Sequence, residues 1–268
     1  MRKTTLCLIG ATLALFVSSL SAVAADFPGR AKYPKVKTIT TDELNTAVKS
    51  GSAVIVDVRS EMEYEVVRPV GTVHIPISDM KFENNIKELA AKNASKTLAM
   101  YCNGVTCLKS YEGAERATAA GVANVVAYDA GIPDWAVRFP DKTLLLGKLM
   151  SESKRPMISD SAHAEHLLNY DSFKKAATAA NAMVIDVRDS VQKSGVLPGL
   201  EKAVAIPLDK FIPNFVKAKA NQDKKLLIFD QVGKQVVWLE YYLIENGYKD
   251  YVFLKGGATS VLGSQDYK

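Results

Sequence analysis

The sequence predicts an α/β protein of two tandem domains, each a parallel sheet with helices on both faces. Two observations carry this prediction. Residues 53–59 and 183–188 are nearly continuous β-branched runs, as in central strands of a parallel sheet covered on both faces. Strand patterns then alternate with helical patterns along the chain, which is the order of elements in βαβ units.

The first domain is expected over residues 35–145. Residues 35–40 alternate like a short strand, and Thr41 begins a helix with a capping residue in place. After the β-branched run at 53–59, the pattern predicts strands over 97–101 and 125–128, and helices over 82–93, from about Cys107 to Ala120, and after Gly131.

The second domain, over residues 155–268, is predicted to be a repeat of the first. Asp-Val-Arg at 57–59 recurs at 186–188, and the other matches keep an offset of 125 to 131 residues. Where the first copy has Cys102, the second has Asp230, so the duplicate is expected to keep the fold without the thiol. The charged segment that ends in proline at Pro156 places the boundary near Lys154.

Residues 1–25 have the pattern of a secretory signal. Arg2 and Lys3 precede an apolar stretch, and small residues allow cleavage near Ala24. The alternative is an uncleaved anchor, but the apolar stretch is short for a membrane span. We therefore expect a periplasmic or secreted protein without stable membrane insertion.

The charge excludes some partners. The net charge is +5, or +3 without Arg2 and Lys3, and no basic run is interleaved with aromatic residues. This mild excess indicates no nucleic-acid partner.

Cys102 is the candidate nucleophile. It ends an apolar strand and lies in a small-residue loop that opens a helix, where backbone N–H groups and the helix N-terminus stabilise a thiolate. The candidate anion-binding loop consists of Asn103, Gly104, Val105 and Thr106, with Lys109 as an additional cation.

Cys107 has two interpretations of equal weight. It is either a resolving thiol that attacks an oxidised or persulfide form of Cys102, or a small packing residue in the first helical turn. A bridge between the two cysteines requires the loop to bend back until the α-carbons lie within about 7 Å. No metal site is expected here, since two thiols are too few for zinc.

Several motifs together resemble the rhodanese (sulfurtransferase) family. They are Asp-Val-Arg at 57–59, Glu63-Tyr64, Pro-Val-Gly at 69–71, Ile75-Pro76, the strand–Cys102–loop–helix unit and the segment 131–135. The resemblance covers both halves, and the Cys-Asn-Gly-x-x-Cys loop is similar to a bacterial subgroup with two loop cysteines. The loop departs from the usual family pattern because Gly104 comes two residues after Cys102 rather than three, and because it holds no arginine.

The resemblance implies that Cys102 carries sulfane sulfur as a persulfide, from a donor such as thiosulfate to a thiol acceptor, without a cofactor. The partners would be these small molecules, with a redox partner protein as a further candidate. Two alternatives remain open: an extracytoplasmic thiol–disulfide redox protein that uses Cys102 and Cys107, and a non-catalytic binding module. A phosphatase is excluded because Leu108 stands where the phosphate-binding arginine would be required.

Other polar residues are interpreted as structural. Asp57 and Arg59 recur in the copy without the thiol, which favours a structural ion pair, and His74 is expected to be a partly buried polar residue. His163 and His166 are three residues apart and could bind a metal, but a solvated helix face is favoured.

Overall fold

The computed structural model describes residues 27–153, 155–190, 193 and 195–263. The expected signal over residues 1–25 and the boundary residue Lys154 lie outside this part of the chain. Within the described ranges, no helix has both the length and the apolar character needed to cross a bilayer.

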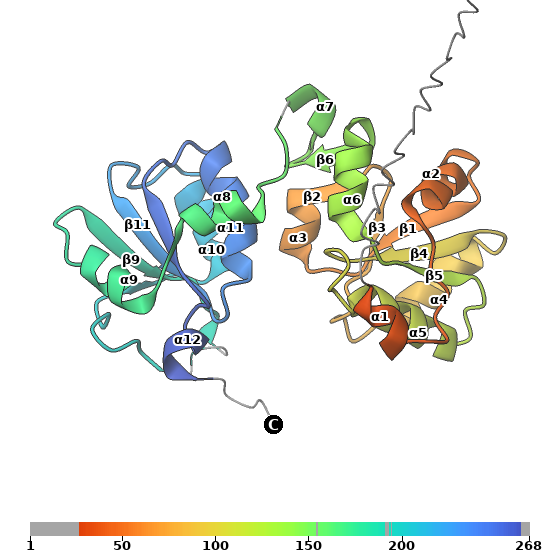
Figure 1. Ribbon diagram of the computed structural model, residues 1–268, viewed down its shortest axis with the longest axis horizontal. Helices are drawn as coiled ribbons and strands as arrows, with labels where there is room; N and C mark the ends of the chain where they lie inside the picture. The colour runs from red at the N-terminus through yellow and green to blue at the C-terminus, as the bar shows by residue number, and fades with distance from the viewer. Residues whose placement is uncertain (1–26, 154, 191–192, 194, 264–268) are drawn as a thin grey trace, which may run out of the picture.

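The first half is a parallel sheet with helices on both faces (Figure 1). Its strand order is β3 (Val73–His74), β1 (Ala53–Asp57), β4 (Thr97–Tyr101) and β5 (Val125–Tyr128). The helices are α1 (Pro28–Lys32), α2 (Thr41–Lys49), α3 (Glu61–Val66), α4 (Phe82–Lys92), α5 (Lys109–Ala119) and α6 (Gly131–Arg138).

Alternation along β1 directs its side chains to two separate cores. Ile55 packs with Leu44 of α2 and Trp135 of α6, whereas Val56 packs with Phe82 of α4 and Tyr111 of α5. The continuous apolar run is thus explained, because both faces of the strand are buried.

The second half is also a parallel sheet flanked by helices, with one strand more than the first. Its strand order is β10 (Val204–Ala205), β9 (Ala182–Asp186), β11 (Lys225–Phe229), β12 (Tyr251–Leu254) and β8 (Leu167–Leu168), all parallel. The helices are α8 (Asp160–Glu165), α9 (Tyr170–Ala176), α10 (Leu208–Phe211), the π-helix Ile212–Val216, α11 (Gln235–Glu245) and α12 (Thr259–Leu262). The predicted α/β class with helix-flanked parallel sheets is confirmed.

Three details differ from the prediction. Residues 35–40 form no strand, only a single bridge between Thr38 and Ala127. The helix expected from about Cys107 begins at Lys109. An unpredicted antiparallel sheet joins β2 (Val67–Pro69), β6 (Thr143–Leu145) and β7 (Lys148–Leu149), and is followed by α7 (Met150–Ser153).

The two halves are in contact. Helix α3 of the first half packs against α11 of the second, and Val66 and Val67 share an apolar core with Tyr241 and Tyr242. Lys148 of the first half forms an ion pair with Glu245, the last residue of α11. Helix α3 carries residues of the candidate site, so this contact bears on function.

Candidate functional site

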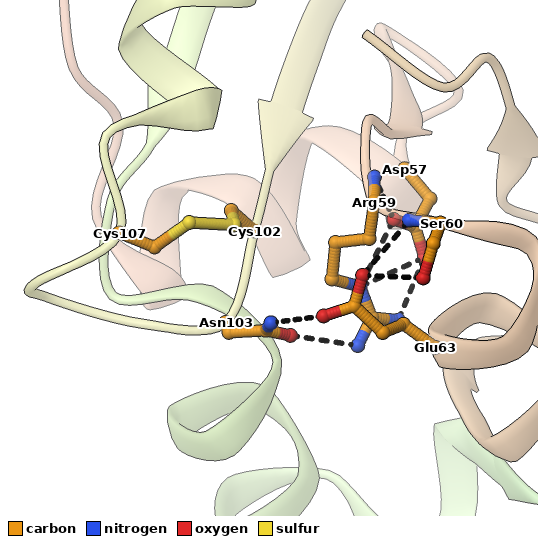
Figure 2. Close-up of a disulfide and its surroundings, with 7 residues drawn as sticks. All are labelled: Asp57, Arg59, Ser60, Glu63, Cys102, Asn103 and Cys107. Atoms are coloured by element: carbon orange, nitrogen blue, oxygen red, sulfur yellow. Dashed lines mark hydrogen bonds and ion pairs between the residues drawn. A yellow bond between two sulfur atoms is a disulfide. The ribbon is translucent and has the colours of Figure 1, made fainter. Parts of the chain in front are cut away.

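Cys102 and Cys107 form a disulfide at the carboxyl end of β4 (Figure 2). Cys102 follows the strand directly and is 1% exposed. Gly104 adopts a φ of +116°, and its carbonyl accepts a 2.9 Å hydrogen bond from the Cys107 N–H. This turn bends the loop back and brings the two α-carbons to 6.2 Å, within the range that a disulfide requires.

The other predicted loop residues lie around this bridge. Asn103 and Val105 are half-buried, Gly104 is buried, and Thr106 and Lys109 are exposed. Among the described residues, no backbone N–H donates to either sulfur in this disulfide form. The expected cluster of donors therefore concerns the reduced or persulfide form of Cys102, and it stays a prediction.

Gly131 braces the end of β4 from the opposite side. It begins α6 with a φ of +66°, and a Cβ added there would lie 2.5 Å from the Cys102 carbonyl oxygen. The Ile132 N–H donates a 3.0 Å hydrogen bond to that same oxygen. Only glycine permits this close approach, which holds the backbone of Cys102 in place.

Arg59 connects the buried ion pair to the loop. Its guanidinium donates through Nε and Nη2 to Asp57, with a shortest distance of 2.7 Å, and both side chains are fully buried. Its Nη1 donates to Asn103 Oδ1 at 3.1 Å. The structural ion pair is thus present as expected, but it also contacts the residue next to Cys102.

Glu63 holds the other end of the Asn103 amide. Asn103 Nδ2 donates to Glu63 Oε1, while Oε2 accepts from the backbone N–H and hydroxyl of Ser60 at 2.9 and 2.7 Å. Burial opposes the charge on this carboxylate, but the hydrogen bonds from Ser60 and Asn103 outweigh it, so the pKa of Glu63 lies below its ordinary value. Figure 2 shows the Asn103 side chain directed toward this group and away from the disulfide.

Sequence reasoning missed the roles of Arg59, Glu63 and Asn103 as one network. The spacing of Ser60 and Glu63 matches a capping box, which the structure forms at the start of α3. This spacing indicates that the Glu63 side chain is held at the start of α3. No local pattern indicates that it also reaches Asn103, 40 positions along the chain.

The equivalent loop of the second half is closed by its own carboxylate. Asp230 accepts backbone hydrogen bonds from Gly233, from Gln235 at 2.6 Å and from Val236 at 3.3 Å. Burial raises the pKa of Asp230, against the lowering effect of these donors. The carboxylate thus accepts hydrogen bonds from three N–H groups of its own loop.

The histidines have structural contacts. His74 stacks on Tyr64 and its Nε2 lies 3.0 Å from the Arg59 carbonyl oxygen, as expected of a partly buried polar residue. The expectation of a solvated helix face at His163 and His166 is wrong. His163 is 9% exposed and pairs with Glu240 of α11, and His166 follows α8 and also lies beside Glu240. No cluster of His, Cys, Asp and Glu suited to a metal ion occurs in the described part of the chain.

Comparisons with known proteins bear on the first half in particular. Residues 40–138 match the family model of the rhodanese-like domain. Two curated Escherichia coli proteins, both named uncharacterized protein YibN, from strain K12 and from O6:H1 strain CFT073, are 29% identical over 102 residues, which is 38% of this chain and 68% of each relative.

Solved structures show low overall similarity. A human single-domain sulfurtransferase is 20% identical, covering 38% of this chain and 97% of its own, with a TM-score of 0.33. A thiosulfate sulfurtransferase from Pseudomonas aeruginosa is 17% identical, covering 88% of this chain and 46% of its own, with a TM-score of 0.36. The residues that match the rhodanese-like family model, 40–138, include the whole Cys102–Cys107 loop.

Proposed function

We propose that this protein is a sulfurtransferase in which Cys102 takes sulfane sulfur from a donor such as thiosulfate and passes it to a thiol acceptor. The observation that carries the proposal is the position of Cys102, between the carboxyl end of β4 and the start of α5, within the residues that match the rhodanese-like family model. The Ile132 N–H holds the Cys102 carbonyl, and Arg59 holds the side chain of Asn103, the next residue. A thiolate in such a place gains from the helix N-terminus.

The reaction has two steps. The reduced Cys102 thiolate attacks the outer sulfur of thiosulfate, the sulfur–sulfur bond of the donor breaks, and sulfite leaves with the electron pair. The acceptor thiolate then attacks the outer sulfur of the Cys102 persulfide, which yields an acceptor persulfide and regenerates the Cys102 thiolate. No cofactor is needed for either step.

The Cys102–Cys107 bridge supports a resolving role for Cys107. The Cys107 thiolate attacks the inner sulfur of the Cys102 persulfide, hydrosulfide leaves, and the disulfide forms. The transferred sulfur is reduced in this step and the two cysteines are oxidised. A dithiol redox partner must then restore the thiols, as befits the proposed periplasmic or secreted location, where disulfides persist.

The same disulfide favours a second candidate, a thiol–disulfide redox protein that uses Cys102 and Cys107 without sulfur transfer. In either case we propose that the second half is a duplicated rhodanese-like domain without a nucleophile, because Asp230 fills its loop.

Sulfite release separates the candidates. Reduced protein, incubated with thiosulfate and a thiol acceptor, is expected to release sulfite with turnover. Cys102→Ser should abolish release, and Cys107→Ser should retain it. Absence of sulfite from the reduced wild-type protein, together with reduction of a disulfide substrate that requires both cysteines, would establish the redox protein instead.

A further inference from the structure

The guanidinium of Arg59 lies near two aromatic rings that come from different halves of the protein. The ring centroid of Tyr101, on β4, is 5.1 Å from the Arg59 Cζ atom, and that of Trp238, on α11, is 5.7 Å away. Arg59 is fully buried. Its N–H groups donate to Asp57, Asn103, the Val67 carbonyl and the Tyr101 hydroxyl. Both rings lie within the distance of a cation–π interaction with the guanidinium.

The second half provides an internal comparison. Arg188 forms the same pair with Asp186 and lies over one ring, that of Phe229 at 5.3 Å. Its Nη1 has no hydrogen-bond partner among the described residues. Gln231, at the place of Asn103, donates to Thr259 instead.

The two halves share some contacts around this arginine, and others occur only in the half that contains Cys102. Both copies have the Asp–Arg ion pair and one ring from the strand beside it. Within the described chain, only Arg59 also bonds the loop amide and lies near a ring of the other half. These two additional contacts both occur in the copy that retained the thiol.

The contacts form a short route from the second half to Cys102. The ring of Trp238 contacts the Arg59 guanidinium, which donates to Oδ1 of Asn103. Asn103 is the residue that follows Cys102 in the sequence. The other end of the amide is held by Glu63, on the helix α3 that packs against α11. Both anchors of Asn103 therefore lie on elements that the second half contacts.

We infer that Trp238 is a positioning residue of the Cys102 loop, and that the second half thereby stabilises the loop conformation in which Cys107 reaches Cys102. The inference bears on the proposed sulfur transfer through the same loop, but it concerns the loop thiols and is measured without a sulfur donor. The π face of Trp238 attracts the Arg59 cation, so an aliphatic side chain, which has no π face, should not replace it.

The test is the equilibrium between dithiol and disulfide in the full chain. In a glutathione buffer, two glutathione thiols reduce the Cys102–Cys107 bridge and become glutathione disulfide, and alkylation followed by intact-mass measurement gives the ratio. An ordered loop holds the two sulfurs within bonding reach. Trp238→Leu is therefore expected to raise the equilibrium constant for reduction by about five- to tenfold, and Trp238→Phe to stay near the wild-type value.

The matched control is Ile244→Ala, which changes an exposed apolar residue of the same helix and should leave the constant unchanged. Circular dichroism selects the variants that fold, and Trp238→Met, also without a π face, replaces the leucine variant if that variant does not fold.

A double-mutant cycle with Asn103→Ala distinguishes positioning from general stabilisation. In the Asn103→Ala background, Trp238→Leu should change the constant by less than about twofold, because its route to the loop is already cut. Full additivity of the two changes, or a Trp238→Leu value equal to wild type, would overturn the inference. A failure of wild-type sulfur transfer would leave this measurement unaffected, so the two proposals fail separately.

Discussion

Gly131→Ala tests whether the close approach of α6 to the Cys102 backbone stabilises the site. The added methyl group would lie 2.5 Å from the Cys102 carbonyl oxygen and 2.8 Å from the Gly104 Cα atom, both parts of the backbone that cannot rotate away. The loop must therefore shift, and the hydrogen bond from the Ile132 N–H to the Cys102 carbonyl must weaken.

The magnitude follows from comparison with a glycine in open surroundings. Gly51 has a φ of +71°, close to the +66° of Gly131, and a Cβ there would meet nothing within 4 Å. Gly51→Ala should cost about 1 kcal/mol of unfolding free energy for the left-handed backbone alone. Gly131→Ala should cost about 2 to 4 kcal/mol more, since overpacking adds about 1 to 3 kcal/mol and the weakened hydrogen bond about 1 kcal/mol.

Urea unfolding of the oxidised variants, followed by circular dichroism, measures this difference. The rate at which dithiothreitol reduces the bridge should rise in Gly131→Ala and stay unchanged in Gly51→Ala. Equal losses of stability in the two variants, with equal reduction rates, would refute the assignment of Gly131 as a brace of the loop.

Three further changes give distinct outcomes. The pKa of Glu63 is lower in the folded protein than its ordinary value, so the charged carboxylate stabilises the fold at any pH above that ordinary value. This stabilisation is lost as the pH falls through the pKa of the folded state. The melting temperature of wild type should therefore exceed that of Glu63→Gln at neutral pH, and the difference should shrink as the pH drops toward about 3. A constant advantage would contradict this. Asp230→Ala should lower the unfolding free energy by about 2 kcal/mol, because one buried and two partly buried N–H groups lose their acceptor, while the reduction rate of the disulfide stays at the wild-type value. A change in that rate would argue that the Asp230 loop acts on the site. Ser110 is 1% exposed and its hydroxyl has no partner among the described residues, so Ser110→Ala should raise the unfolding free energy by up to about 1 kcal/mol, and a measurable loss would point to an undetected partner.

The core elements could be predicted because their patterns are local. The β-branched run that contains β1 indicates a strand buried on both faces, and Ile55 and Val56 indeed face different cores. Strands of two or three residues, such as β2, β6 and β7, are too short to show a periodicity, so the antiparallel sheet was not predicted.

The candidate site was predictable only in part, since its contacts join distant segments. The position of Cys102 at a strand end is visible in the sequence, and so is its proximity to Cys107. The two hydrogen bonds that hold the Asn103 side chain come from Arg59 and Glu63, which lie 44 and 40 positions away in the sequence. The same limitation applies to His163, whose partner Glu240 is 77 positions along the chain.

The most direct test of sulfur transfer through Cys102 is the intact mass of the reduced protein after incubation with thiosulfate. The wild-type chain and Cys107→Ser should each gain the mass of one sulfur atom, and the gain should persist longer in Cys107→Ser because no second thiol expels the sulfur. Cys102→Ser should gain nothing. A sulfur adduct on Cys102→Ser, or none on the reduced wild type, would contradict the proposed function.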